Sequence, residues 1–198
     1  MDYTQTIAQR TVEYIDEGHI YLVDGKIVPS ITQMLSVKFG GKYDGIKRAV
    51  LESAAQKGTE VHEAIQKLCE TGIYPTDLKE VRNFLFLKEQ YNFEVLANEV
   101  PVILFERDEP VAAGRLDMVL RMNGMIGGAD IKRTCGLDKD YLAYQLNLYR
   151  VAYRQSYGVE WEFLRCLHLR EDVRKFVPIP ICEWLVDEII ELWRSKDE

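Results

Sequence analysis

Apolar and polar positions alternate near the start of the chain, over residues 12–28. This stretch contains the pair Asp-Gly at 24–25, which favours a tight hairpin turn between two strands. Further extended segments are predicted from apolar, β-branched and aromatic residues at 94–106, 111–122, 125–134 and 160–170. The first three of these follow one another closely, so we expect them to form a three-stranded meander.

Apolar positions recur with helical spacing in four other segments. These segments are residues 46–70, 76–91, 137–158 and 182–196. In the first of them, Gly58 predicts either two helical pieces or one helix that bends at this residue. Ser30 is followed three residues later by Gln33, which resembles a capping box and predicts that a further helix begins there.

The predicted elements follow the order hairpin, helices, three-stranded meander, helix, strand and closing helix. This order indicates an α/β (α+β) protein in which helices flank a central mixed sheet. The length of 198 residues suits one domain, and no repeat or linker divides the chain.

Charge and cysteine content narrow the possible functions. The net charge of −7 argues against a protein that coats nucleic acid by bulk attraction, although residues 37–48 and 130–134 are locally basic. The four cysteines are widely spread and form no CxxC pair, which gives little support to a zinc ribbon or an iron–sulfur cluster. No apolar run approaches the length of a membrane span, and the first residues lack a secretion signal, so we expect a cytosolic protein.

A second turn pair, Asn-Gly at 123–124, predicts a hairpin with a defined register. A two-residue turn there places Asp117 directly opposite Asp130. Two facing carboxylates repel each other, and a divalent cation between them would supply the compensating charge. A bulge that shifts the register and leaves both acids in water explains the same residues equally well.

The same register places Arg115 opposite Lys132, on the face that carries the two acids. The neighbouring glycines at 127–128 would let another backbone or a ligand approach the sheet closely. This face of the hairpin is therefore the first candidate for a functional site.

Four short motifs occur in a fixed order along the chain. They are Gly58-x-x-x-His62, Gly114-Arg115-x-Asp117, Asp130-Ile131-Lys132 and Gln145-x-x-x-Tyr149. With the opening segment DGKIVPSITQML, they resemble the PD-(D/E)XK nucleases, in particular the RecB-type and phage-exonuclease branch. The resemblance implies a restriction-endonuclease-like core within a single nuclease domain, residues 1–198. Its N-terminal hairpin and helices would occupy 1–93, its catalytic core 94–182 and its C-terminal helix 183–198.

The resemblance also implies a Mg²⁺ or Mn²⁺ site. Asp117 and Asp130 match the metal-binding carboxylates, and the carbonyl of Ile131 would be a further ligand. Lys132 matches the catalytic lysine that orients or activates a water and offsets phosphate charge. His62 matches a helix histidine that sits against the metal. Taken alone, such a histidine is more often an ordinary polar group on a helix, and an imidazole suits manganese better than magnesium.

Four further residues are candidates for supporting the site or contacting DNA. Gln145 and Tyr149 match a helix motif with this role, although ordinary helix packing explains Tyr149 nearly as well. Glu99 is a candidate for an acidic position before the meander, and Arg115 for a DNA-binding residue. Family members with an iron–sulfur cluster carry flanking cysteines that this chain lacks, so no cluster is expected.

The resemblance implies a metal-dependent deoxyribonuclease. The leading expectation is a phage-type exonuclease that acts in DNA recombination or repair. The alternatives are a structure- or sequence-selective endonuclease and a non-catalytic DNA-binding module that retains the fold. DNA is the expected partner, a single-strand annealing or recombination protein is a further candidate, and homo-oligomerisation stays open. We expect no membrane contact and a location in the cytoplasm of a bacterium or a phage-infected host cell.

Overall fold

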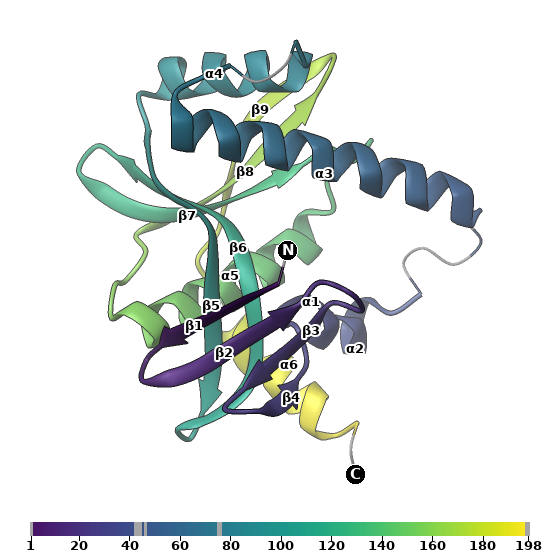
Figure 1. Cartoon of the computed structure of the whole chain (residues 1–198), viewed down its shortest axis with the longest axis vertical. Helices are drawn as coiled ribbons and strands as arrows, with labels where there is room; N and C mark the ends of the chain where they lie inside the picture. Colours follow the sequence, from purple (N-terminus) through teal and green to yellow (C-terminus); the bar gives the residue numbers. More distant parts are fainter. Residues whose placement is uncertain (1, 42–44, 46, 75–76, 197–198) are drawn as a thin grey trace.

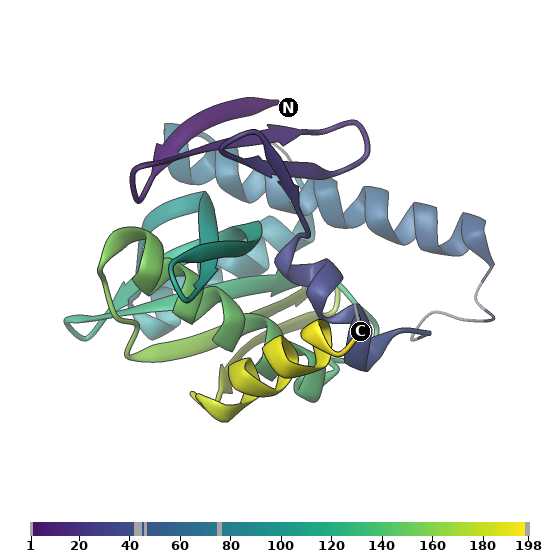
Figure 2. The same cartoon turned by 90° about the horizontal axis from the view of Figure 1, so that it is seen from below.

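Two sheets and six helices make up the computed structural model, which describes residues 2–41, 45, 47–74 and 77–196 (Figures 1 and 2). One sheet has four antiparallel strands, and the other has five strands with one parallel pair of neighbours. This architecture confirms the predicted α+β class with a central mixed sheet. Within the described ranges, no helix combines the length and the apolar character that a membrane span needs.

The four-stranded sheet is a meander at the start of the chain. Its strands are β1 (Tyr3–Ile7), β2 (Arg10–Ile15), β3 (Ile20–Val23) and β4 (Lys26–Val28). The predicted turn at 24–25 joins β3 to β4. The segment 12–28 holds a second turn, however, because the chain reverses between β2 and β3 as well. The strand β1 was not predicted, since the three residues at its centre are polar and exposed.

The five-stranded sheet contains the predicted meander. Its strands are β5 (Glu94–Glu106), β6 (Glu109–Met122), β7 (Met125–Lys132), β8 (Phe163–Arg170) and β9 (Val173–Ile179). The strand β7 ends at Lys132, two residues earlier than predicted. The strand β8 lies parallel to β7, and β9 at the sheet edge was not predicted. Only Phe176 and Ile179 are buried in β9, so its sequence shows little apolar alternation.

The helices agree with the predicted segments apart from their ends. They are α1 (Ile31–Met34), α2 (Ser36–Phe39), α3 (Arg48–Thr71), α4 (Lys79–Tyr91), α5 (Lys139–Tyr157) and α6 (Trp184–Arg194). The predicted capping box is confirmed, because Gln33 N–H donates to Ser30 Oγ at 3.0 Å and Ser30 N–H donates to Gln33 Oε1 at 2.7 Å. The helix α3 runs through Gly58 as one element, and residues 46 and 76 of the predicted helices lie outside the described residues.

Helices cover both faces of the five-stranded sheet (Figure 1). The helices α3 and α4 pack on one face through a buried cluster around Phe84, and α5 and α6 pack on the other face around Leu148. The four-stranded sheet packs against β5 and β6 through a third cluster around Ile103. In both views the first turns of α3 extend past the rest of the molecule (Figures 1 and 2).

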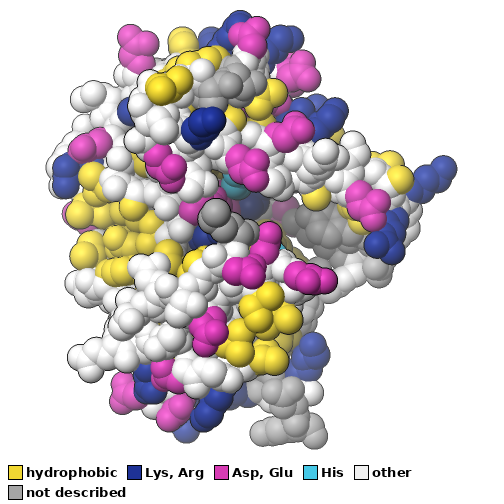
Figure 3. All heavy atoms as spheres, viewed as in Figure 1, with side chains coloured by type: hydrophobic (Ala, Val, Ile, Leu, Met, Phe, Trp, Pro, Cys, Tyr) yellow, Lys and Arg dark blue, Asp and Glu magenta, His cyan; other side chains and the backbone are white. Residues whose placement is uncertain are grey.

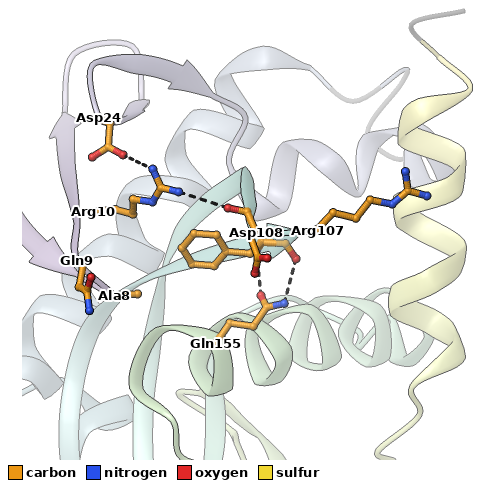
Figure 4. A pocket seen from close by; sticks show the side chains of 8 residues that line it. Ala8, Gln9, Arg10, Asp24, Arg107, Asp108 and Gln155 are labelled. Atoms are coloured by element: carbon orange, nitrogen blue, oxygen red, sulfur yellow. Dashed lines mark hydrogen bonds and ion pairs between the residues drawn. The ribbon is translucent and has the colours of Figure 1, made fainter.

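A hydrogen bond between two hairpin tips joins the small sheet to the large one (Figure 4). Arg10 donates from Nη1 to Asp24 Oδ2 at 2.9 Å and from Nη2 to the carbonyl of Asp108 at 3.4 Å. Gln155 of α5 bonds both backbone groups of Phe105, at 2.8 and 2.9 Å. These contacts border a hollow of about 710 Å³. The bond from Arg10 to Asp108 joins the two sheets, whereas the pair of Arg10 with Asp24 lies within the small sheet and Gln155 joins α5 to β5.

The glycines at 127–128 admit a neighbouring strand and a buried ring. A Cβ atom at Gly128 would lie 2.0 Å from Cζ3 of Trp161, whose side chain is buried. A Cβ atom at Gly127 would lie 2.3 Å from the carbonyl oxygen of Phe163. The expected close approach is therefore made by the protein itself at both positions. A ligand is not needed to explain these two glycines.

We predict that Gly128→Ala lowers the free energy of unfolding by about 1–3 kcal/mol, because the added methyl group overpacks the site of Trp161. Urea denaturation measures this change. Gly136→Ala is the matched control, because a Cβ atom there meets no heavy atom of the described residues within 4 Å. Equal stability of the two variants would contradict the packing of Trp161 on β7.

Candidate metal centre

The site begins where the ladder between β6 and β7 ends. The predicted turn at 123–124 and its register are confirmed as far as the pair Met118–Ala129. Beyond that pair the strands separate, and Ile131 N–H donates to Asp117 Oδ2 at 2.6 Å. A carboxylate thus takes the place of the backbone carbonyl that would have continued the ladder.

The predicted pairing of Arg115 with Lys132 is wrong, because β6 and β7 have already separated at this point. On the other side of β6, Arg115 lies opposite Pro101 of β5, and its Nε forms an ion pair with Glu99 Oε2 at 2.7 Å. The guanidinium also lies over the ring of Tyr14, 5.4 Å from the ring centre. Arg115 therefore orients an acid of the site while packing against the small sheet.

Glu99 adopts a left-handed backbone conformation, with a φ angle of 49°, in the middle of β5. This conformation costs a residue with a side chain about 1–2 kcal/mol. The neighbours Asn98 and Val100 both pair with β6, so the ladder holds Glu99 in place from both sides. Strain of this kind is concentrated at functional sites, where the surrounding structure maintains it.

Three side chains form a group that could hold a cation. His62 Nδ1 lies 3.7 Å from Asp117 Oδ1 and 3.9 Å from Glu99 Oε1. One potential ligand atom from each of these residues lies within 4.8 Å of the others. His62 Nε2 donates to the Ile131 carbonyl at 3.2 Å, which orients the ring so that Nδ1 faces the carboxylates. Two carboxylates and one imidazole are a donor set that suits Mn²⁺, and the carboxylates also suit Mg²⁺.

The charges of this group change the protonation of His62. Burial disfavours the imidazolium, but Asp117, Glu99 and Asp130 outweigh it and raise the pKa of His62 to about 9. In the absence of a metal ion, the imidazolium therefore supplies the positive charge between the two carboxylates. A metal ion that binds Nδ1 must displace this proton.

Asp130 lies next to the group but is bound to Lys132. The Lys132 Nζ atom lies 2.8 Å from Asp130 Oδ1 and 2.7 Å from Oδ2. Burial raises the pKa of Asp130 to about 6, with Lys132 opposing the shift and Asp117 adding to it. Burial would lower the pKa of Lys132, but Asp130 and Asp117 raise it above its ordinary value. The structure therefore groups Glu99 and His62 with Asp117 as possible ligands, and leaves Asp130 as the partner of the lysine.

The helix α5 places Gln145 and Tyr149 in the same cleft, which has a volume of about 470 Å³. Both side chains are buried, and Gln145 Oε1 has no hydrogen-bond partner among the described residues. A Cβ atom at Gly114 would lie 3.0 Å from Cε1 of Tyr149, so this glycine makes room for the ring. Eight of the nine predicted site residues line the cleft, and Ile131 contributes only its backbone groups.

The small sheet and the residues after it form a wall of the cleft that the sequence did not predict. His19, Tyr21, Ser30 and Thr32 line it, opposite the cleft-facing side of α3. The space-filling view shows the hollow between these parts, with acidic, basic and histidine side chains inside it (Figure 3). No local pattern marks these residues as part of a site, because only the packing of the two sheets brings them there.

Two contacts fix the chain directly after Lys132. Arg133 Nε donates to Glu80 Oε1 at 2.7 Å, and the Glu80 side chain is only 3% exposed. His168 Nε2 donates to the carbonyl of Thr134 at 2.7 Å. These contacts tie the end of β7 to α4 and β8, and they explain Arg133 and His168, for which the sequence indicated no role.

Comparisons with known proteins identify no family for this chain. No family model matches it, and no curated protein matches it. Among solved structures, it is similar to one described as "Crystal structure of SSO0001", with 17% sequence identity over 86% of this chain and 77% of that chain. The TM-score of 0.44 is too low to carry an argument about fold or function.

We predict that His62 stabilises the metal-free protein most at low pH. Because its pKa is about 9 in the folded protein and about 6.5 when unfolded, its contribution is complete below pH 6.5 and is lost as the pH rises through 9. In EDTA, His62→Gln should therefore cost on the order of 1–3 kcal/mol at pH 6 and much less at pH 9.5. Urea denaturation at both pH values measures the difference, and an NMR titration with an ordinary pKa for His62 would contradict it.

We predict that Arg133→Ala lowers the free energy of unfolding by about 3 kcal/mol, since it leaves the carboxylate of Glu80 buried without its partner. Arg121→Ala is the matched control. Its pair with Glu94 is exposed, with 50% and 61% of the two side chains accessible, so its loss should cost less than about 1 kcal/mol. Similar stability losses in the two variants, measured by chemical denaturation, would contradict the proposed contribution of the Arg133–Glu80 pair to stability.

Proposed function

We propose that this protein is a metal-dependent DNA nuclease that hydrolyses phosphodiester bonds. The leading candidate is a phage-type exonuclease that acts in DNA recombination or repair. The observation that carries the proposal is the meeting of His62, Glu99 and Asp117 with the Asp130–Lys132 pair in one cleft. The motifs that resemble PD-(D/E)XK nucleases lie up to 91 positions apart in the sequence, from 58 to 149, and all four contribute residues to this cleft.

The charge of the cleft supports a requirement for a divalent cation. Four acids line it, namely Glu63, Glu99, Asp117 and Asp130. The positively charged groups of the described lining, Arg115, Lys132 and the imidazolium of His62, pair with Glu99, Asp130 and Asp117. A divalent cation would therefore supply the additional positive charge that the phosphates of DNA need in this cleft.

Each residue then has a distinct task. His62, Glu99 and Asp117 would hold the ion, which when bound supplies an activated water and stabilises charge on phosphorus. Lys132 would place a positive charge beside the phosphate, and Asp130 keeps this lysine both charged and correctly oriented. Because the pKa of Lys132 is raised, we assign it the role of a charge that orients the water, and not that of a base.

We predict that the protein degrades linear duplex DNA with Mg²⁺ or Mn²⁺ and not with EDTA. End-labelled linear DNA and covalently closed circles, incubated in parallel, distinguish the modes of action. Loss of only the linear form supports an exonuclease, while cutting of circles supports the endonuclease alternative. Binding of DNA without cleavage in either metal would support the non-catalytic module.

In the same assay, Lys132→Ala should lower kcat about 10²–10³-fold, because it removes a charge aimed at the transition state. Asp117→Asn should abolish binding of Mn²⁺ together with cleavage. Lys67→Ala is the matched control, since this lysine is exposed on α3. Unchanged cleavage by Lys132→Ala or Asp117→Asn would reject the proposed site.

A further inference from the structure

Within the described part of the protein, no contact requires a glycine at position 58 of α3. It lies inside a helix of 24 residues, where glycine is less favourable than alanine. A Cβ atom at this position would meet no heavy atom of the described residues within 4 Å. In contrast, Gly114, Gly127 and Gly128 each make room for a neighbouring side chain or backbone. The absence of a side chain at Gly58 therefore benefits no contact within the described protein.

Gly58 belongs to the side of α3 that faces the candidate metal centre. The α3 residues that line the cleft are Gly58, Thr59, His62, Glu63 and Gln66. Their spacing is that of one helix face, and Gly58 lies one turn before His62, about 6 Å along the helix axis. A DNA strand whose phosphate lies at a metal ion beside His62 would therefore pass Gly58 with its next nucleotide.

Two exposed threonines border the groove near Gly58. Thr32 lies on the opposite wall, and Thr59 lies beside Gly58, where its hydroxyl donates to the backbone of its own helix at 3.2 Å and can still accept a hydrogen bond. Tyr21 and Ser30 line the same wall but are buried, and Ser30 Oγ caps α1. Hydroxyl groups are frequent partners of phosphate and sugar oxygens, whereas a wall built for an apolar ligand would carry few of them. The groove between α3 and this wall thus suits the sugar–phosphate backbone of a nucleic-acid strand.

We propose that Gly58 forms a subsite in which the sugar–phosphate backbone next to the cleaved bond lies directly against the α3 backbone. This subsite rests on the proposed nuclease function and adds to it the place where the strand crosses the helix. Any side chain at position 58 would lift the strand away from α3 and weaken its binding. Because the metal ligands are separate groups, metal binding itself would stay intact.

The test compares Gly58→Ala and Gly58→Leu with the wild-type protein on end-labelled linear duplex DNA with Mn²⁺. We expect Gly58→Ala to raise KM for DNA about tenfold, and Gly58→Leu to raise it further, with kcat nearly unchanged. The melting temperature of Gly58→Ala should rise by about 2–4 °C, because a helix gains an alanine. Calorimetric titration with Mn²⁺ alone should give the wild-type affinity for both variants.

Ser53→Leu is the matched control for added bulk on α3, because Ser53 is exposed and outside the cleft lining. It should leave KM unchanged. Unchanged KM in both Gly58 variants would overturn the subsite while leaving the nuclease function intact. A lower Mn²⁺ affinity in Gly58→Ala would also overturn it, since the residue would then act through His62. Failure of the wild-type protein to cleave or bind DNA would reject the nuclease function, and the subsite with it.

Discussion

One residue, Ile131, joins the two halves of the candidate centre through its backbone. Its N–H donates to Asp117 Oδ2, and its carbonyl accepts from His62 Nε2. The first bond ends the ladder between β6 and β7, and the second orients the imidazole towards the carboxylates. Because Asp130 and Lys132 flank Ile131 on the separated strand, the same peptide units set the position of the acid and the lysine as well.

The charges of the centre balance only when all of its partners are counted. Glu99 is neutralised by Arg115 and Asp130 by Lys132, which leaves Asp117 with the imidazolium of His62. Burial makes each unpaired charge expensive in this cleft, so the network is sensitive to the loss of any member. A metal ion that binds here would replace the Nδ1 proton of His62 as the source of positive charge beside Asp117. This is a small change for the surrounding fold.

The hairpin at 123–124 shows how far the sequence alone could predict the site. The turn type and the period of two predicted Asp117 directly opposite Asp130, and the ladder follows that register but ends one pair earlier, at Met118 and Ala129. The end of the ladder depends on a side chain that competes with a backbone carbonyl, and no local pattern encodes it. The ion pair of Arg115 with Glu99 and the left-handed backbone of Glu99 were not predicted either, because no local pattern encodes them. The wall at Tyr21 and Ser30 depends on sheet packing across distant parts of the chain.

The small sheet is bonded to the core next to the motif residue Gly114. Ala113 N–H donates to the Pro29 carbonyl at 3.0 Å, and Ser30 forms an isolated bridge with Ala113. Lifting this sheet would break backbone hydrogen bonds and expose the cluster around Ile103. The wall that the small sheet forms is therefore held to the scaffold by backbone hydrogen bonds, and a wider cleft would require these bonds to break.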